Sequence, residues 1–123
     1  EFGVDLRTIK ISDSGDIAPS ENVKTLEDAH AALSQLIERL VRQGKIPVVI
    51  GGGNDQSYAN ALGLLRTLDT KDIPAVVNID AHLDVRPLVN SPNGPLAHSG
   101  SPFRLLLEDR TSCQLRNFER IIN

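Results

Sequence analysis

The chain has 123 residues, a usual length for one domain, and its 40% apolar and 24% charged residues form a globular balance. A net charge of −3 and an aromatic content of 3% argue against a nucleic-acid partner. No apolar run approaches the length of about 18 residues that a membrane span needs. The first twenty residues do not have the pattern of a signal peptide, and the lone Cys113 cannot pair internally, so we expect a cytoplasmic protein.

The first part of the chain predicts a strand and then a helix. Alternating β-branched residues over 4–11 are typical of a strand. Leucine and alanine then recur at helical spacing over 25–43. Thr25 and Asp28 have the spacing of a capping box, and Gly44 follows as a stop signal.

Two short apolar runs, 46–50 and 73–79, predict strands that are buried on both faces, as in a parallel sheet covered by helices. Residues 56–68 between them predict a second helix, which Asn54 and Asp55 can cap. This order is typical of a doubly wound α/β fold. The strand residues expected in the core are Val48, Val49, Ile50, Val76, Val77 and Ile79.

A long loop is predicted over 83–101, since three prolines and two glycines interrupt it. Ser101 and Pro102 then have the pattern of an N-cap followed by a first-turn proline, which predicts a helix to about Asp109. In an open α/β sheet, ligands bind beyond the carboxyl ends of the strands. The glycine turn after residue 50, the segment from Asp80 and the long loop all fall there.

Asp80, His82 and Asp84 stand at alternate positions directly after a predicted strand. In an extended chain, side chains two residues apart point the same way, so these three can converge on one point. Carboxylate and imidazole ligands suit divalent Mn, Fe or Zn. The competing interpretation is a solvated strand end. Three potential ligands in this pattern favour a metal site.

The turn Gly51–Gly53 has neither the lysine of a P-loop nor the spacing of a dinucleotide-binding loop. It is either a plain strand-to-helix turn or a turn that places Asn54 at the same edge of the sheet as Asp80. Arg86 could pair with the aspartates or bind a substrate carboxylate. His98 could be a ligand, a proton shuttle or a solvated residue, and solvation is the default. His30, in the first predicted helix, is given no role.

Together, the strand with its glycine turn, the Asp80–Asp84 row followed by Arg86, and the Ser-Gly-Ser-Pro-Phe segment at 99–103 resemble the ureohydrolase (arginase) superfamily. The similarity is greatest to its formimidoylglutamase branch. The resemblance implies a three-layer α/β/α fold with a parallel sheet. It also implies that residues 1–123 are one part of a single domain, the C-terminal part of which lies outside the chain.

The resemblance further implies a homo-oligomeric enzyme with a binuclear Mn²⁺ site. Such an enzyme hydrolyses a C–N bond in a linear amidine, a formimino or guanidino compound such as N-formimino-glutamate, by a manganese-activated hydroxide. Asp80 would bridge the two metals, His82 would hold one and Asp84 the other, which makes Asp80 and Asp84 catalytic. Arg86 and Ser99 would bind the substrate.

Two departures from the family pattern are visible. Asn54 stands where the family usually has a metal-binding histidine, so one or both metals could be lost. The family's downstream Asp-x-Asp pair does not occur in these residues, which also contain no methionine, so we expect a fragment.

Two other functions remain open on this sequence. One is a metal-deficient pseudoenzyme of the same fold, with a structural or regulatory role in an oligomer. The other is a calcineurin-like metallophosphoesterase, which also begins with Asp-x-His after a strand. Its downstream Gly-Asn-His motif does not occur here.

Overall fold

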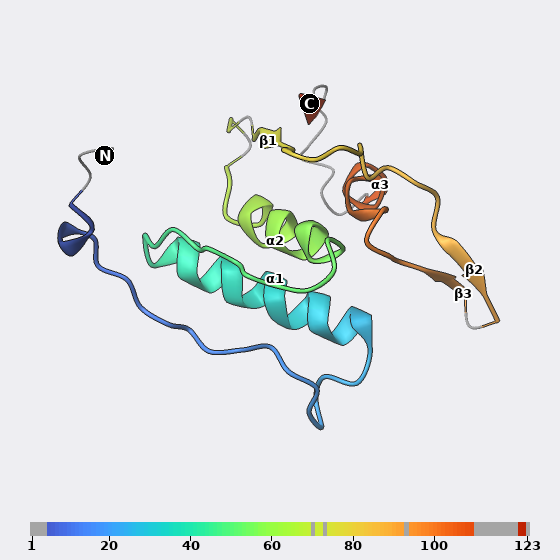
Figure 1. Ribbon diagram of the computed structural model, residues 1–123, viewed down its shortest axis with the longest axis horizontal. Coiled ribbons are helices and arrows are strands. Elements are labelled where there is room, and N and C mark those ends of the chain that lie inside the picture. Colours follow the sequence, from blue (N-terminus) through green and yellow to red (C-terminus); the bar gives the residue numbers. More distant parts are fainter. Residues whose placement is uncertain (1–4, 70, 73, 93, 110–120, 123) are drawn as a thin grey trace.

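The computed structural model describes residues 5–69, 71–72, 74–92, 94–109 and 121–122. Three α-helices lie at its centre, and short strands lie beside them (Figure 1). In chain order the elements are the 3₁₀ helix η1 (Leu6–Thr8), α1 (Leu26–Arg42), α2 (Gln56–Leu65), β1 (Val76–Val77), β2 (Val89–Ser91), β3 (Gly94–Leu96), α3 (Pro102–Glu108) and β4 (Ile121–Ile122).

Helix α1 begins with the predicted capping box. The Thr25 hydroxyl accepts a hydrogen bond from the Asp28 backbone N–H at 3.1 Å, and the Asp28 carboxylate accepts one from the Thr25 N–H at 2.9 Å. The backbone N–H groups of Lys24 and Thr25 hold the pKa of the Asp28 carboxyl below its usual value. Gly44 follows with a φ of +73°, a left-handed conformation that glycine adopts without strain. The predicted first helix is therefore confirmed.

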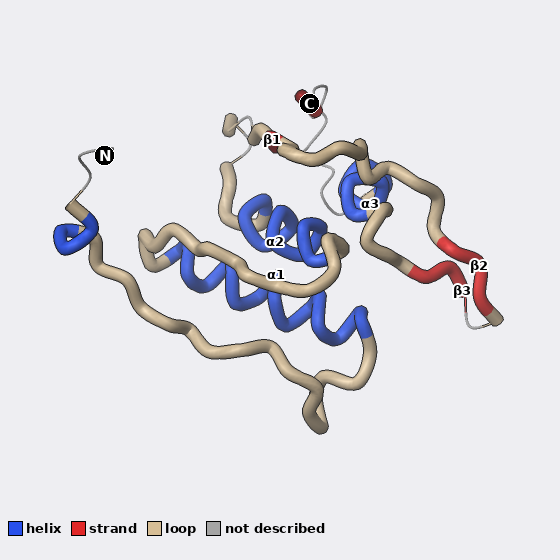
Figure 2. Tube along the Cα trace, viewed as in Figure 1, coloured by secondary structure: helices blue, strands red, loops and turns tan. Residues whose placement is uncertain are grey.

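Helices α1 and α2 pack against each other (Figures 1 and 2), and Gly63 lies at their contact. A Cβ atom at Gly63 would lie 2.5 Å from the Ser34 carbonyl oxygen and 2.7 Å from the Ile37 Cβ. The Arg66 guanidinium donates to the buried Ser34 hydroxyl at 3.1 Å, close to the same contact. Helix α3 packs on α2 in turn. The buried apolar residues of this three-helix core are Ile37, Ala59, Leu62, Phe103 and Leu106.

Helix α2 is shorter than predicted, and its predicted side-chain cap is wrong. The helix ends at Leu65, and the carboxylate of Asp55 at the N-cap position makes no capping hydrogen bond. The physical reason is that the side chains of Asn54 and Asp55 form hydrogen bonds with other elements. No described helix is both long and apolar enough to cross a membrane.

The apolar runs are not buried on both faces in the described structure, so that expectation is wrong. Ile46, Val48 and Ile50 are 92%, 83% and 95% exposed, and the residues between them are half-buried. The run is extended, with alternate side chains on opposite faces, and no described residue covers the outer face. The second run alternates in the same way, with Val77 73% and Ile79 96% exposed.

Strand pairing is sparse among the described residues. β1 and β4 form a parallel pair, with Val76 opposite Ile121 and Val77 opposite Ile122. This pair is parallel, as the sequence predicts. The run at 46–50 does not pair with any described strand. The predicted strand at 4–11 is wrong over its described part, where η1 leads into an extended loop (Figure 2). Cys113 lies outside the described residues.

The predicted long loop contains a β-hairpin, so it is not without secondary structure. β2 and β3 pair antiparallel, with Val89 opposite Leu96 and Ser91 opposite Gly94. The hairpin carries the chain out and back, so that the two ends of the segment meet: the Arg86 N–H donates to the Gly100 carbonyl at 2.9 Å. The helix that begins at Pro102 is confirmed as α3.

Tyr58 joins α2 to the end of α3. Its hydroxyl donates a hydrogen bond to the Asp109 carboxylate at 2.8 Å. Burial of the ring, followed by the hydrogen bond to Asp109, raises the pKa of Tyr58 to about 12. The phenol therefore keeps its proton at pH values at which an ordinary tyrosine has already lost it.

Replacement of Gly63 by alanine tests the close contact between α1 and α2. Alanine favours a helix over glycine by about 1 kcal/mol. The added methyl group would meet a backbone carbonyl that cannot easily move, and overpacking of this kind costs about 1–3 kcal/mol. We expect Gly63→Ala to lower the free energy of unfolding in urea. Asn60→Ala is the matched control, since Asn60 is exposed on the same helix, and it should not destabilise the protein. A stabilised Gly63→Ala protein would contradict the packing described.

Titration of Tyr58 gives a second test. In the unfolded chain this phenol ionises near its ordinary pKa of 10.0, and in the folded chain at about 12. The unfolded state therefore loses the proton first, so stability should be full below pH 10 and should fall as the pH rises towards 12. The difference in tyrosinate absorbance between the protein and Tyr58→Phe measures the titration. A midpoint at the ordinary tyrosine value would show that the hydroxyl is solvated.

Candidate metal and substrate site

Asn54 and Asp84 lie in contact at the centre of the candidate site. Asn54 follows the glycine turn ahead of α2, and Asp84 lies on the segment between β1 and β2. The Asn54 side-chain amide donates a short hydrogen bond to Asp84 Oδ2. The Ser57 hydroxyl donates to Asn54 Oδ1 at 2.6 Å. The glycine turn thus brings Asn54 to the segment that carries the predicted ligands.

Asp84 is buried, with only 6% of its surface exposed. Its φ of +50° is left-handed, and it is the only described non-glycine residue with a positive φ. Its carbonyl accepts a hydrogen bond from the Phe103 N–H at 3.2 Å, which ties the segment to the start of α3. Among the described residues, the partner of its carboxylate is the neutral amide of Asn54, and no cation lies within ion-pair distance. Buried carboxylates are normally paired with a cation or bound to a metal.

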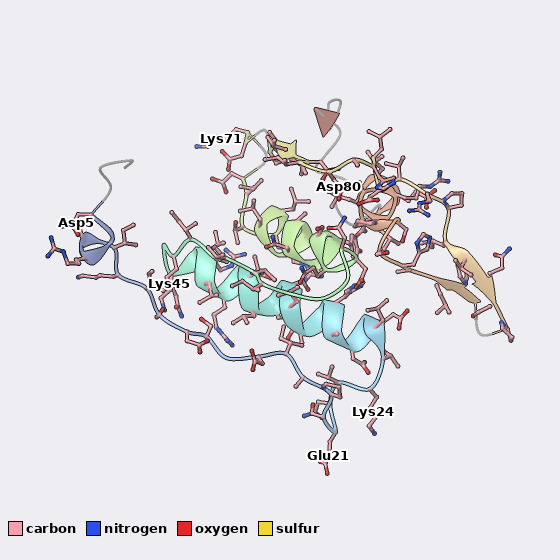
Figure 3. All side chains as sticks on the ribbon, in the orientation of Figure 1. Asp5, Glu21, Lys24, Lys45, Lys71 and Asp80 are labelled. Atoms are coloured by element: carbon pink, nitrogen blue, oxygen red, sulfur yellow. The ribbon has the colours of Figure 1, made fainter. Side chains whose placement is uncertain are left out.

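Asp80 and His82 lie on an exposed bend of the same segment, and Figure 3 labels Asp80 on the chain that leads from β1 past α3. Asp80 Oδ1 accepts a hydrogen bond from the His82 backbone N–H at 2.9 Å and lies 3.4 Å from His82 Nδ1. The backbone N–H of His82 is the main cause that lowers the pKa of the Asp80 carboxyl. The Asn78 side chain donates to the His82 carbonyl at 2.9 Å and supports the bend.

The extended geometry predicted for Asp80, His82 and Asp84 is wrong. The bend at Asp80 and His82 and the left-handed Asp84 break the alternation of directions. Asp84 faces inwards, and the other two side chains are exposed. Within the described ranges, no three His, Cys, Asp or Glu side chains form a group that could hold a metal ion. The metal-ligand roles of these residues therefore stay predictions.

Arg86 lies against a glycine. A Cβ atom at Gly100 would be 2.6 Å from the Arg86 Nε and 2.9 Å from its Cζ, so the guanidinium occupies the space that a side chain would fill. No described carboxylate lies within ion-pair distance of the guanidinium, so the predicted pairing of Arg86 with the aspartates is absent from the described residues. Ser99, the other predicted substrate residue, is exposed on the turn beside Gly100.

His98 holds the loop together. Its Nδ1 accepts a hydrogen bond from the Gly100 N–H at 3.2 Å, and its Nε2 lies 3.0 Å from the Pro87 carbonyl oxygen. Since a carbonyl only accepts, these two bonds together require the neutral ring with its proton on Nε2. His98 N–H also donates to the Ser101 hydroxyl at 3.0 Å. Of the three roles considered for His98, solvation does not describe these contacts, since they make it a fixed part of the loop.

Sequence reasoning missed Ser57 and Ser101 as supports of this site. Ser57 fixes the Asn54 amide, and a serine three residues after an asparagine at a helix start is the signal that could have indicated it. Ser101 was predicted as an N-cap, but its hydroxyl donates to the His98 carbonyl at 2.9 Å and makes no capping bond. The loop contact replaces the cap because the chain turns back on itself just before α3.

The arginase family model matches residues 1–118 of this chain. The chain therefore belongs to the arginase family, and its fold is the α/β fold of that superfamily, as the sequence predicts.

Curated relatives point to one branch of this family. A formimidoylglutamase of Geobacillus thermodenitrificans is 39% identical over 99 residues, which are 80% of this chain and 29% of the relative. A formimidoylglutamase of Streptococcus gordonii is 35% identical over 116 residues, 94% of this chain and 33% of the relative. The chain thus spans about a third of the length of the curated relatives it matches.

Solved structures agree with this. Formiminoglutamase of Trypanosoma cruzi with Mn²⁺ matches with a TM-score of 0.72 and 45% identity, over 86% of this chain and 33% of that chain. A variant of the same enzyme in which an asparagine is replaced by histidine, also with Mn²⁺, matches with the same TM-score and 44% identity.

Proposed function

We propose that the intact protein to which these residues belong is a metal-dependent hydrolase of linear amidines, and that N-formimino-glutamate is its substrate. The observation that carries this proposal is Asp84, a buried carboxylate with a neutral amide as its described side-chain partner. A buried negative charge is costly unless a cation compensates it, and a divalent metal ion is such a cation. The formiminoglutamase with Mn²⁺ that this chain resembles supports the choice of metal.

The donor atoms fit a divalent metal ion of this kind. Asp80 and Asp84 offer carboxylate oxygens and His82 offers an imidazole nitrogen, a mixed set that suits Mn²⁺. The backbone N–H of His82 lowers the pKa of the Asp80 carboxyl and so favours its ionised form. Bound Mn²⁺ would supply a Lewis acid and lower the pKa of a coordinated water molecule. For one ion to be shared by all three, the exposed side chains of Asp80 and His82 would have to turn towards the buried Asp84.

Asn54 orients Asp84 in this proposal, and the metal does not need it as a ligand. Its N–H group already donates to Asp84, and its amide oxygen accepts from Ser57. An oriented carboxylate loses less freedom when it binds a metal, which is the role of outer hydrogen bonds at metal sites.

Arg86 would bind the carboxylate of the substrate. Its guanidinium has no described anionic partner and is held against Gly100, so it can form two parallel hydrogen bonds to a carboxylate. Neutral His98 fixes the loop behind it. In the reaction, water adds to the amidine carbon, the bond from that carbon to the substituted nitrogen breaks, and the departing amine takes up a proton. The products are glutamate and formamide.

A second candidate is a pseudoenzyme of the same fold with a structural or regulatory role in an oligomer. One observation favours it: the Asn54 side chain is turned so that its N–H, and not its oxygen, meets Asp84. The two candidates differ in whether the intact protein binds metal.

Manganese content of the intact protein, measured by elemental mass spectrometry, tests the proposal. We expect Mn²⁺ to bind to the wild type and to be lost in Asp84→Asn. Because this substitution removes a buried charge that lacks a described cation, it should leave the metal-free protein at least as stable as the wild type. Asp72→Asn, on an exposed turn, is the control and should bind as the wild type does. A metal-free wild-type protein after incubation with manganese would favour the pseudoenzyme.

Substitution of Arg86 tests the substrate. A charge-assisted hydrogen bond contributes about 1.5–3 kcal/mol, so Arg86→Ala should raise KM for N-formimino-glutamate by about tenfold or more. Arg86→Lys should recover only part of this, since lysine cannot form the paired bonds. KM for an amidine without a carboxylate should not change. Equal effects on both substrates would show that Arg86 does not bind the carboxylate.

A further inference from the structure

His30 lies on α1 and contacts the residue that follows Asn54. Its Nε2 donates to Asp55 Oδ2 at 2.9 Å, across 25 residues of sequence. The two side chains are only 11% and 17% exposed. Among the described contacts between a basic and an acidic side chain, this is the one in which both side chains are most buried, and sequence reasoning gave His30 no role.

The histidine ring is held in place. Tyr58 packs edge-on against it with ring centroids 5.9 Å apart, and the Tyr58 hydroxyl is itself bound to Asp109. Helix α1 behind the ring is fixed to α2 by the close contact at Gly63. The N–H group of His30 that contacts Asp55 is therefore held in a fixed position.

Asp55 stands where a helix cap is expected but does not cap α2. One of its carboxylate oxygens binds His30, and the other lies over Gly53, in the space that a side chain on that glycine would fill. The carboxylate is thus held between α1 and the glycine turn. Asn54 lies between Gly53 and Asp55 in the chain, so the carboxylate that contacts His30 belongs to one neighbour of Asn54 and lies against the other.

We propose that His30 is a positioning residue for the metal site: by holding Asp55 against the glycine turn, it sets Asn54 at the distance from which its amide orients Asp84. This inference rests on the proposed function, since it assigns the purpose of the Asn54–Asp84 contact to metal binding. His30 itself touches neither of these residues in any described hydrogen bond. Its effect on the site passes through the backbone of the turn.

The test compares manganese affinity in the intact protein and in His30 variants. Substitution of groups that orient metal ligands typically weakens metal affinity by about 10–100-fold. Because His30 acts at one further remove, we expect His30→Leu to raise the Mn²⁺ dissociation constant by about tenfold, at the lower end of that range. His30→Gln keeps an N–H that can reach Asp55 and should restore most of the affinity.

Ser34→Ala is the matched control. Ser34 lies one turn along the same helix, is buried, and binds Arg66 at the end of α2 away from the site. The substitution weakens the contact between α1 and α2 without affecting Asp55. It should lower Tm and leave manganese affinity unchanged. If His30→Leu behaves like Ser34→Ala, with lower Tm and wild-type manganese affinity, the inference is overturned.

A measurement on the metal-free protein separates this inference from the proposed function. The side-chain amide hydrogens of Asn54, followed by NMR, should exchange with solvent faster in His30→Leu than in the wild type or His30→Gln. Unchanged exchange would overturn the positioning role, even in a protein that binds manganese. Faster exchange in a protein that binds no manganese would still show that His30 positions Asn54. It would overturn the assignment of this contact to a metal site, and with it the proposed function. If His30→Leu does not fold, Asp55→Leu and His30→Gln supply the same comparison.

Discussion

Helix α2 lies against α1 at Gly63, where a hydrogen atom in place of a side chain lets the helix meet the backbone carbonyl of Ser34. The candidate site depends on this contact, because Asn54 lies just before α2, and α3 covers another side of the same helix. A helix pair held this closely has one relative position, since interiors are densely packed and do not deform continuously. The packing of α2 on α1 therefore sets the position of the start of α2, independently of the contacts within the candidate site.

The two residues just before α2 form hydrogen bonds with two different parts of the chain. Asp55 bonds back to His30 on α1, and Asn54 bonds forward to Asp84 on the segment after β1. Two neighbouring side chains that could have capped their own helix instead connect three separate parts of the chain. The start of α2 lacks a side-chain cap, because the side chains of Asn54 and Asp55 make contacts with other parts of the chain instead.

Signals that act between neighbouring residues led to correct predictions of local structure. The capping box at Thr25 and the proline at the start of α3 define helix starts, because each acts within one turn. The site was predicted in part: Asn54 does meet the segment that carries Asp80 and Asp84. Its geometry was not predicted, since the left-handed Asp84 contacts Asn54 and Phe103, which come from elsewhere in the chain. The prediction that the strands are buried on both faces was wrong for a similar reason: an apolar run does not indicate which residues cover each of its faces.

The sequence by itself determined the family, the α/β class, the helix starts and the chemical types gathered near the strand ends, because these depend on residue identity and short-range spacing. Only the tertiary structure decided which of those groups meet. It buried Asp84 beside a neutral amide, left Asp80 and His82 exposed on a bend, and gave His30 and Asp55 a shared contact. Such pairings depend on how helices and loops distant in sequence pack together. Spacing along one chain contains no information on that scale.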